Sequence, residues 1–481
     1  MNQSAQVQYR TAKGWQLALA PAIQCVPILF IILMTFASYA ATGIYGVATV
    51  LAGTIITGSR VFDAITDPII GLLSDRLITR FGRARPLSVL GYLITSAAVL
   101  SMFKFAVGGG ENGVFAFALI YMVYIIGYTI FSVGAGMVGP TLTNDPKQRP
   151  VYGRWATAYT TVISSTINIV LAVTLMPKHN YQMGLPLFAD LCVLVVVAAG
   201  ILVAITVITV SFAGTDTPET YVGQTKEAVS FRDMLDVLTH NRPFQMYIIA
   251  AASDKLAMQT ASQSAITVMV FGIVIGNYSF NGQLTFINMF VTLALLFFAV
   301  SRMAGKSGLK KAVTQWTVLS IVAYLAMWVF MLLTDTLQIT IDPVLKVVFI
   351  VLFCAMSAAK MACSCVTEPM RYDVIDYELS RSGRYMPAVV NTAYSFVDKL
   401  ISSLAATIVA AAVATIGYTT TMPQATDPVT SGIFHVAMFL WLGMPILGWI
   451  CTLIAMKFYS LDREAMVEVQ KKNAEIRAAS K

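Results

Sequence analysis

Long apolar stretches, separated by short charged connections, limit the fold of this chain more than any other feature of its sequence. A helix needs about 20 mostly apolar residues to cross the hydrocarbon core of a bilayer. Twelve stretches meet this requirement, so we expect an all-α membrane protein with twelve transmembrane helices. The expected spans cover residues 16–40, 44–74, 86–106, 114–140, 151–176, 186–213, 243–275, 281–303, 311–334, 344–372, 385–416 and 431–459.

The composition agrees with this prediction. Of the 481 residues, 57% are hydrophobic and 12% are charged, and the mean hydropathy is +0.73. Soluble domains carry about 25% charged residues, so this chain has roughly half the charge that a soluble surface needs. The net charge of +8 does not indicate a nucleic-acid partner, because the basic residues lie in short connections between apolar stretches, where they set orientation.

Cysteine and histidine offer no catalytic or metal-binding pattern. The six cysteines are scattered, and Cys363 and Cys365 are spaced so that a helix would place them on different faces. We therefore expect no disulfide framework, no metal site and no cofactor. The three histidines lie at span ends or in a loop, with no acid or nucleophile beside them. The polar start of the chain leads into a span too long for a signal peptide, so we expect no cleavable signal.

Basic residues gather in every second connection, while the opposite connections carry only Lys104, Lys178 and Lys346. By the positive-inside rule, both termini are expected in the cytoplasm, with the chain crossing the cell's inner membrane many times. The basic residues on the expected inner side are Arg10, Lys13, Arg76, Arg80, Arg83, Arg85, Lys147, Arg149, Arg154, Lys226, Arg232, Arg242, Arg302, Lys306, Lys310, Lys311, Arg381 and Arg384.

The longest inner connection divides six spans from six. We expect an N-terminal six-helix half at residues 1–213, a central cytoplasmic loop at 214–242, a C-terminal six-helix half at 243–459 and a cytoplasmic tail at 460–481. Residues 231–238 of the loop predict a short amphipathic helix against the membrane surface, and the tail predicts a solvated helix or a frayed end. Many secondary transporters have this layout, with substrate held near the midplane between the halves.

One stripe of acids stands out within the second span. Asp63, Asp67, Gly71 and Asp75 recur every four residues, so a helix places them on one face. Asp63 and Asp67 lie deep in the apolar stretch, where ionisable groups usually mark an ion or substrate path. Together with Thr66 and the carbonyl that Pro68 leaves without a backbone donor, they predict an oxygen cage for a small cation or a proton. The alternative is a structural ion pair with Arg60, one turn earlier.

Three blocks of sequence resemble one transporter family. GLLSDRLITRFGRARP, at residues 71–86, resembles the loop between the second and third helices of the major facilitator superfamily. With DAITDP directly upstream, the segment resembles the glycoside–pentoside–hexuronide:cation symporters within that superfamily. EPMRYDVIDYELSRSGRYMPAVVNTAYSFVDKL at 368–400 and YTIFSVGAGMVGPTLTNDPKQRPVYGRWA at 128–156 resemble further segments of the same family. The resemblance implies the major facilitator fold of two six-helix halves.

The resemblance also implies roles for individual residues. Asp63 and Asp67 match the acids that bind the coupling cation in this family. Arg154 matches an arginine near the sugar, Lys399 a lysine near the cation and sugar sites, and Tyr128 a tyrosine near the cavity. Residues at the cytoplasmic helix ends are expected to form a gate, namely Asp75, Arg76, Arg83, Asp373 and Asp376.

The chain departs from the melibiose permease type of this family at its sugar-binding acids. Ser132 and Gly136 stand where that type has an acid and a tryptophan on the fourth helix, and Gln24 lies in a first span that has no acid. We therefore assign Gln24 and Ser132 to the solute site. The missing acid leaves both H⁺ and Na⁺ open as the coupling ion, because two neighbouring acids such as Asp63 and Asp67 share a proton readily. Loss of coupling is a further alternative.

Other charges lie within later spans. Lys255, with Gln259 one turn after it, predicts part of the solute site, and the alternative is that an acid elsewhere neutralises Lys255. Lys360 has Glu368 two turns later as a possible partner. With Arg154 and Lys399 these cations rival the acids in number, which slightly favours an anionic solute such as a uronide. Ion pairing among the same residues explains them equally well.

These observations predict a secondary active transporter that imports a glycoside or sugar derivative with H⁺ or Na⁺ by alternating access. The solute and the lipid bilayer are the expected partners, and we expect a monomer. An uncoupled facilitator, or an exporter of another organic solute on the same fold, is the alternative. A membrane-bound enzyme or sensor is disfavoured, because the sequence has neither a nucleophile–base set nor a soluble domain of about 100 residues.

Overall fold

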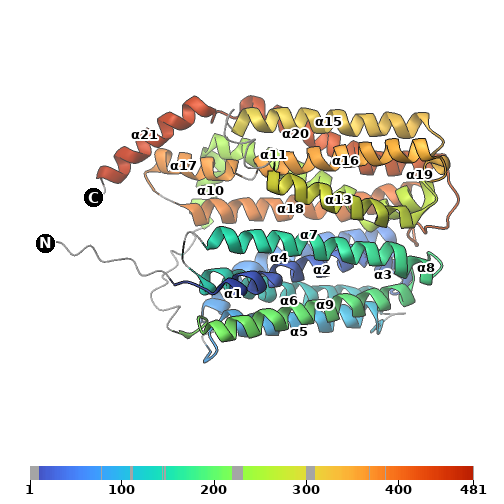
Figure 1. Ribbon diagram of the computed structural model, residues 1–481, viewed down its shortest axis with the longest axis horizontal. Helices are drawn as coiled ribbons and strands as arrows, with labels where there is room; N and C mark the ends of the chain where they lie inside the picture. Colours follow the sequence, from blue (N-terminus) through green and yellow to red (C-terminus); the bar gives the residue numbers. More distant parts are fainter. Residues whose placement is uncertain are drawn as a thin grey trace. The chain divides into compact units, whose positions relative to one another are not determined.

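The computed structural model describes residues 10–76, 79–108, 112–143, 145, 148–218, 231–298, 309–367, 369–384 and 386–479. Within these ranges the regular structure is helical, apart from one bridge between Thr79 and Gly82. The chain forms two compact units, of which unit 1 comprises Met1–Ala48 and Phe62–Thr225, and unit 2 comprises Thr49–Val61 and Lys226–Lys481. Within each unit the helices run side by side (Figure 1).

One long helix, α4 (Thr49–Arg76), contributes to both units. Its first part packs on α18 (Pro387–Thr415) in unit 2, where Thr57 Oγ1 donates to the Ser403 carbonyl at 2.8 Å. Its second part, which carries the acid stripe, belongs to unit 1. The other helices of unit 1 are α1 (Gly14–Leu19), η1 (Ala20–Cys25), α2 (Val26–Met34), α3 (Ala37–Gly43), α5 (Ala84–Phe103), α6 (Gly113–Leu142), α7 (Arg149–Val170), η2 (Leu171–Leu175), α8 (Met176–Lys178) and α9 (Leu185–Ala213).

Unit 2 contains the helices of the second half of the chain. Besides α18, they are α10 (Phe231–His240), α11 (Arg242–Ala261), α12 (Ser264–Thr267), η4 (Val268–Val274), α13 (Tyr278–Phe298), α15 (Leu309–Leu333), η5 (Thr336–Gln338), α16 (Pro343–Thr367), α17 (Met370–Ser382), α19 (Ser431–Met438), η6 (Phe439–Gly443), α20 (Met444–Phe458) and α21 (Arg463–Ala479).

Helical structure lies at each of the twelve segments that the hydropathy pattern predicts. Within the described residues, nine of these helices are long and apolar enough to cross a membrane, and the bent pair of α11 with α12 and η4 raises the number to ten. The helices α4 and α13 are not among them. A multi-pass helical membrane protein is therefore confirmed, while the count of twelve spans stays a prediction.

The helices α5 and α6 approach each other closely along most of their length. A Cβ atom on Gly91 of α5 would overlap the backbone of Phe131, and one on Gly134 of α6 would lie 2.6 Å from the Ser88 nitrogen. Small residues at a helix interface let backbones approach in this way within membranes, where dispersion forces hold helices together. This contact fixes the face of α6 that carries the polar residues of unit 1.

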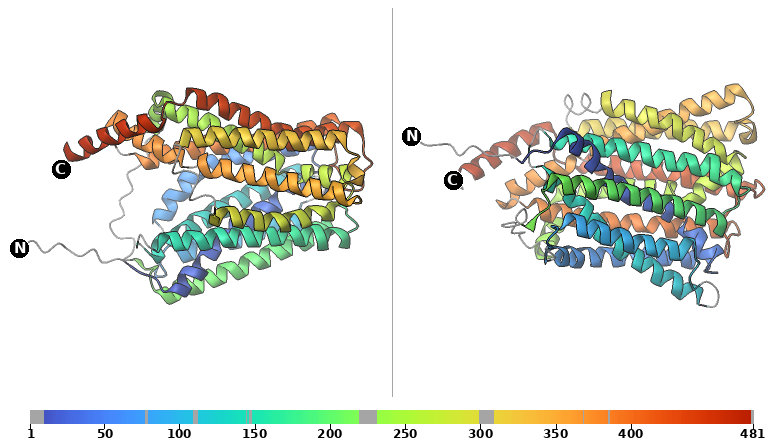
Figure 2. Two further views of the ribbon diagram at one scale, coloured as in Figure 1. Left: turned by 45° about the horizontal axis from the view of Figure 1, so that its top comes forward. Right: turned by 60° about the horizontal axis from the view of Figure 1, so that its bottom comes forward.

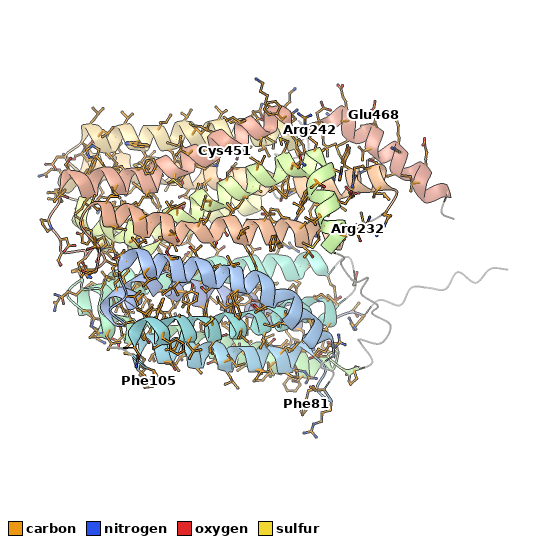
Figure 3. All side chains as sticks on the ribbon, turned by 180° about the vertical axis from the view of Figure 1, so that it is seen from behind. Phe81, Phe105, Arg232, Arg242, Cys451 and Glu468 are labelled. Carbon is orange, nitrogen blue, oxygen red and sulfur yellow. The ribbon has the colours of Figure 1, made fainter. Side chains whose placement is uncertain are left out.

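Exposed aromatic residues lie just beyond both ends of α5. Phe81 precedes the helix and is 51% exposed, and Phe105 follows it and is 62% exposed (Figure 3). Each ring lies beneath a cation, with Arg80 at 4.7 Å from the Phe81 centroid and Lys104 at 5.7 Å from that of Phe105. Aromatic and basic side chains are typical anchors at membrane–water interfaces, so these two positions fit the boundaries of a span.

Two segments that we expect at a surface pack partly onto protein. In α10, Met234 and Val237 are buried in the apolar core of unit 2, so its apolar face packs on protein, and its place relative to the membrane stays a prediction. The tail helix α21 lies beside α17 (Figures 1 and 2), where Val469 and Asn473 are buried and Glu468 stays exposed. The tail is a docked helix rather than a frayed end, because its apolar side completes the same core.

Candidate functional site

A buried carboxylate on α4 lies at the centre of the site in unit 1. The Asp63 residue is 2% exposed, and its Oδ1 accepts a hydrogen bond of 3.0 Å from Thr129 Oγ1 of α6. Thr66 donates its hydroxyl to the Asp63 carbonyl at 3.2 Å, so its own oxygen still has lone pairs to offer. Oxygen atoms of this kind suit small hard cations or a proton. Thr129 is not among the residues predicted from the sequence, although it directly follows Tyr128 in a block that resembles the family.

The rest of the acid stripe continues along the same helix. Because α4 is one helix from Thr49 to Arg76, its backbone places Asp67 one turn after Asp63 on the same face. The side chains of Asp67, Asp75 and Arg76 lie outside the described part of the structure. Their roles in the coupling site and the gate therefore stay predictions.

Gln24 links three elements of unit 1 close to Ser132. From η1, its Nε2 atom donates to the Ala135 carbonyl of α6 at 3.2 Å and to the Tyr152 hydroxyl of α7 at 3.5 Å. Ser132 lies one turn before Ala135 and is half-buried. At these positions, where the melibiose permease type has acids, the chain presents an amide and hydroxyl groups, which can both donate and accept. Tyr152 is a further polar residue that is not among those predicted from the sequence.

Aromatic rings accompany these polar groups. On α6, Tyr128 is half-buried, and its ring lies 5.8 Å from that of Tyr124. On α7, Arg154 is exposed, and the rings of Trp155 and Tyr159 lie 6.1 Å apart. Rings and a cation on one helix can stack on a sugar and bind its hydroxyl or acid groups. The structure thus brings Gln24, Tyr152 and the α6 face together within unit 1, and it leaves Arg154 accessible.

In unit 2, the helix that carries Lys255 is interrupted directly after the predicted site residues. Helix α11 ends at Ala261, and the chain continues into α12 and η4 at an angle of 52°. The Gln259 carbonyl accepts bonds from Ser262 Oγ at 3.1 Å and from Gln263 Nε2 at 3.4 Å, so side chains serve the broken turn. Lys255 is exposed and Gln259 is half-buried. Interrupted helices commonly supply binding groups in transporters.

The acid that acts on Lys360 in the fold differs from the one that the sequence suggests. Asp254 of α11 interacts electrostatically with Lys360 of α16 and also with Lys255. The sequence suggests Glu368 as the partner of Lys360, and Glu368 lies outside the described residues. Helix packing therefore brings the negative charge of Asp254, which is distant in the sequence, to act on Lys360.

Lys399 of α18 is half-buried and directly follows Asp398. The Tyr394 hydroxyl lies 3.5 Å from Asp398 Oδ1, one turn earlier on the helix. The predicted solute residues thus divide between the units, with Gln24, Tyr128, Ser132 and Arg154 in unit 1 and Lys255, Gln259 and Lys399 in unit 2.

The predicted gate acids of unit 2 lie on the short helix α17. Burial and then the neighbouring Asp376 raise the pKa of Asp373 from 3.8 to about 6. Asp376 is tied to the tail helix, because its Oδ2 accepts from Gln470 at 2.7 Å and its carbonyl accepts from Asn473 at 2.8 Å. The tail helix therefore holds one of the two acids, which the sequence did not indicate.

A fully buried carboxylate on the same helix is saturated with hydrogen bonds. Glu378 Oε2 accepts from Asn241 at 2.8 Å and from Arg381 Nε at 3.0 Å, and its Oε1 accepts from Arg381 Nη2 at 2.9 Å. Arg381 also pairs with Asp236, and Arg384 pairs with Asp233 at 3.1 Å. These bonds attach α10 to α17 and to the residues that follow it. They also lower the pKa of Asp236, chiefly through Arg381.

The RFGRARP segment of unit 1 forms a comparable cluster around Asp216. Asp216 is 0% exposed, and its carboxylate accepts from the backbone nitrogens of Arg83 at 3.0 Å, Ala84 at 3.3 Å and Arg85 at 2.9 Å, at the start of α5. Arg85 Nε adds an ion pair at 3.2 Å. Gly82 has φ +81°, and a Cβ atom there would overlap Asp216, so the segment needs this glycine. Arg83, a predicted gate residue, is buried here.

Known proteins resemble this chain along almost its whole length. The sequence model described as "MFS/sugar transport protein" matches residues 20–463. The candidate glycoside/cation symporter YagG of Escherichia coli strain K12 is 24% identical over 93% of this chain and 91% of its own length. The isoprimeverose transporter of Lactiplantibacillus pentosus is 22% identical over 93% of this chain and 89% of its own.

A solved structure shares the fold. The nucleoside transporter NupG superposes with a TM-score of 0.61 at 12% sequence identity, over 93% of this chain and 99% of the NupG chain. At this identity the likeness concerns the fold alone. The family match, the two relatives and the motifs around Asp63 together show that the chain belongs to the glycoside–pentoside–hexuronide:cation symporters, the MFS/sugar transport proteins of the major facilitator superfamily.

Proposed function

We propose that this protein is a secondary transporter that imports a glycoside or related sugar derivative together with H⁺ or Na⁺. Members of its family are transporters rather than enzymes, and relatives over nearly the whole chain carry the names of a glycoside/cation symporter and an isoprimeverose transporter. The protein crosses the inner membrane twelve times, in two six-helix halves with both termini in the cytoplasm. The halves rock about a central solute site by alternating access.

The observation that carries this proposal is the Asp63 carboxylate, which is buried at membrane depth with the Thr129 hydroxyl as a hydrogen-bond partner. A negative charge inside a membrane span is costly, so a bound proton or Na⁺ lowers the free energy of a state that excludes water. Coupling requires that the inward-open and outward-open states bind the cation with different affinity. Asp67 and Thr66 are proposed to complete the oxygen ligands.

The solute is proposed to be recognised by neutral groups and cations rather than by acids. Gln24, Tyr152 and Ser132 can donate and accept hydrogen bonds around sugar hydroxyls, and Tyr128 can stack on a ring. Arg154 and Lys255 are exposed, which supports a slight preference for acidic sugars such as uronides. Lys360 does not add to that preference, because Asp254 already provides counter-charge.

The test is solute uptake into proteoliposomes by the wild type and by Asp63→Asn, under a pH gradient or a Na⁺ gradient. We expect gradient-driven accumulation by the variant to be at least about 100-fold lower than by the wild type. The reason is that the Asp63 charge supplies binding energy for the coupling cation, and the variant lacks this charge. Exchange of solute between equal concentrations should persist, because exchange needs the solute site and not the gradient. The matched control is Asp190→Asn, an acid that pairs with Lys178 at 2.7 Å and is 38% exposed.

Undiminished accumulation by Asp63→Asn would sink the coupling assignment. If the wild type equilibrates a sugar without responding to either gradient, the uncoupled facilitator is correct. If no sugar or acidic sugar is exchanged by the wild type, the solute lies outside the carbohydrates.

A further inference from the structure

Unit 2 contains a second membrane-depth carboxylate, for which the family motifs provide no role. Asp254 lies in the middle of α11, and its Oδ1 atom is buried and accepts no hydrogen bond from the described residues. Trp449 of α20 interacts with this carboxylate through its indole N–H, in a contact too long or too bent for a full hydrogen bond, because Nε1 is buried without a close acceptor among those residues. The donor that lies beside this buried carboxylate is therefore a weak one.

The charged and titratable groups around Asp254 come from three helices. Lys360 and Cys363 lie on α16, Tyr324 on α15 and Lys255 next to Asp254 on α11 itself. The Tyr324 ring packs edge-on against the Trp449 ring, with centroids 4.6 Å apart, and the Thr317 hydroxyl lies 3.4 Å from Cys363 Sγ. From α20 the neighbour of Asp254 is the uncharged Trp449. Lys360 is thus the main buried counter-charge for Asp254.

Glu378 of the same unit shows how a purely structural buried carboxylate is stabilised. Both Glu378 oxygens accept hydrogen bonds, from Asn241 and Arg381, and this saturation stabilises a buried charge. Asp254 Oδ1 has no close hydrogen bond among the described residues, and the weakly placed Trp449 indole is the donor beside the carboxylate. Burial removes hydration from this carboxylate, and the charge of Lys360 acts on it in the opposite sense. Groups with such opposed influences are those that exchange protons during function.

We propose that Asp254, poised by Lys360, is a proton-binding site of unit 2, separate from the cation site at Asp63. A proton from water forms an O–H bond on the Asp254 carboxylate, and the Asp254–Lys360 pair changes from net zero charge to +1. Release of the same proton to water returns the two groups to net zero charge. No other bond forms or breaks.

Proton binding at Asp254 changes the electrostatics of α11 and α16. It removes the attraction that holds Lys360 towards α11, and it leaves the Lys360 charge in need of another partner or of water. A conformation that hydrates Lys360 is therefore favoured when Asp254 is protonated, which makes transport depend on pH even when Na⁺ occupies Asp63. This consequence for transport rests on the proposed function, whereas proton binding itself does not.

The first experiment measures the proton without any solute. Infrared difference spectra of the purified wild type across a pH series should contain the carbonyl band of a protonated carboxyl group, shifted in D₂O. We expect Asp254→Asn to lose one such band and Lys360→Met to retain it, because the carboxyl that carries it is still present. Asp190→Asn is the control and should leave it unchanged. Identical bands in the wild type and in Asp254→Asn would overturn the proposal.

The second experiment separates a proton site from a structural pair. Asp254→Asn combined with Lys360→Met removes both charges, so it avoids leaving an unpaired charge in the bundle. We expect the double variant to exchange solute at a rate that no longer varies with pH, whereas exchange by the wild type changes at least about 3-fold across the pH range of the infrared band. Wild-type pH dependence in the double variant would overturn the proposal. If the wild type carries no sugar, the function proposed above fails, and the infrared spectra still decide the proton site.

Discussion

The carboxylates at the helix ends of this protein differ from those in the middle of its helices. Asp216 and Glu378, at the ends, are each 0% exposed and accept several hydrogen bonds from backbone nitrogens, arginine or asparagine. Asp63 accepts a hydrogen bond from the Thr129 hydroxyl of α6, and Asp254 Oδ1 has no close hydrogen bond among the described residues. Burial alone therefore does not distinguish the structural acids from those proposed to bind a cation or a proton.

This difference indicates which carboxylates of a membrane transporter can readily bind a cation. A carboxylate that accepts several N–H bonds is stabilised in its ionised form, so a proton or a metal ion must displace those donors before it can bind. A carboxylate with few donors keeps lone pairs available at a depth where charge is costly. Cation binding is then favourable, and it can differ between two conformations of the protein.

The largest effect on stability is expected at Asp216. Replacing Asp216 with Ala leaves the first backbone nitrogens of α5 and the Arg85 guanidinium without their acceptor, and we expect the free energy of unfolding to fall by about 3–5 kcal/mol. Chemical denaturation of the purified protein in mixed micelles measures this change. Asp190→Ala, at an exposed ion pair, should change it by less than about 1 kcal/mol. Equal losses in the two variants would break the contrast between saturated and exposed acids.

An intermediate effect is expected at Glu378. Glu378→Gln keeps an acceptor for Asn241 but removes the charge that faces Arg381, and we expect a loss of about 1–3 kcal/mol in the same denaturation measurement. Because Glu378 is structural, the pH dependence of solute exchange by the surviving folded protein should equal that of the wild type. A shifted pH profile would show that a saturated carboxylate also takes part in coupling.

The smallest effect is expected at Asp373, outside the membrane spans. Burial and Asp376 raise its pKa from 3.8 to about 6, so the folded protein holds this proton more tightly than the unfolded chain does. The contribution of Asp373 to the free energy of unfolding is therefore largest below pH 4 and falls as the pH rises to about 6. Asp373→Asn should flatten this part of the pH–stability curve, as measured by thermal unfolding between pH 4 and pH 8. An unchanged slope would assign the dependence to other groups.

Much of the protein can be predicted from local sequence. The apolar stretches predict the membrane helices because transfer of a helix into lipid depends on the summed hydropathy of adjacent residues. The four-residue spacing of Asp63 and Asp67 predicts a shared helix face for the same local reason. The motifs around residues 60–86 and 368–400 predict the family, and the match over residues 20–463 confirms it.

The partners of the buried acids could not be predicted in this way. Thr129 lies 66 residues from Asp63, Asp216 lies 133 residues from Arg83, and Asn241 lies 137 residues from Glu378. The packing partner of α10 could not be predicted either, because its periodicity is equally suited to a membrane surface and to the protein core that it covers. An amphipathic pattern specifies that one face is buried and does not specify what buries it.

Hydropathy and spacing along the chain thus predicted a helical membrane protein and the shared helix face of Asp63 and Asp67, because both depend on neighbouring residues. Which acids are saturated with hydrogen bonds was settled by helix packing, because a hydrogen bond needs its donor within about 3 Å. That requirement joins residues from distant segments, such as Asn241 at the N-cap of α11 with Glu378 of α17. The saturation of Asp216 and Glu378 therefore exists only in the folded protein.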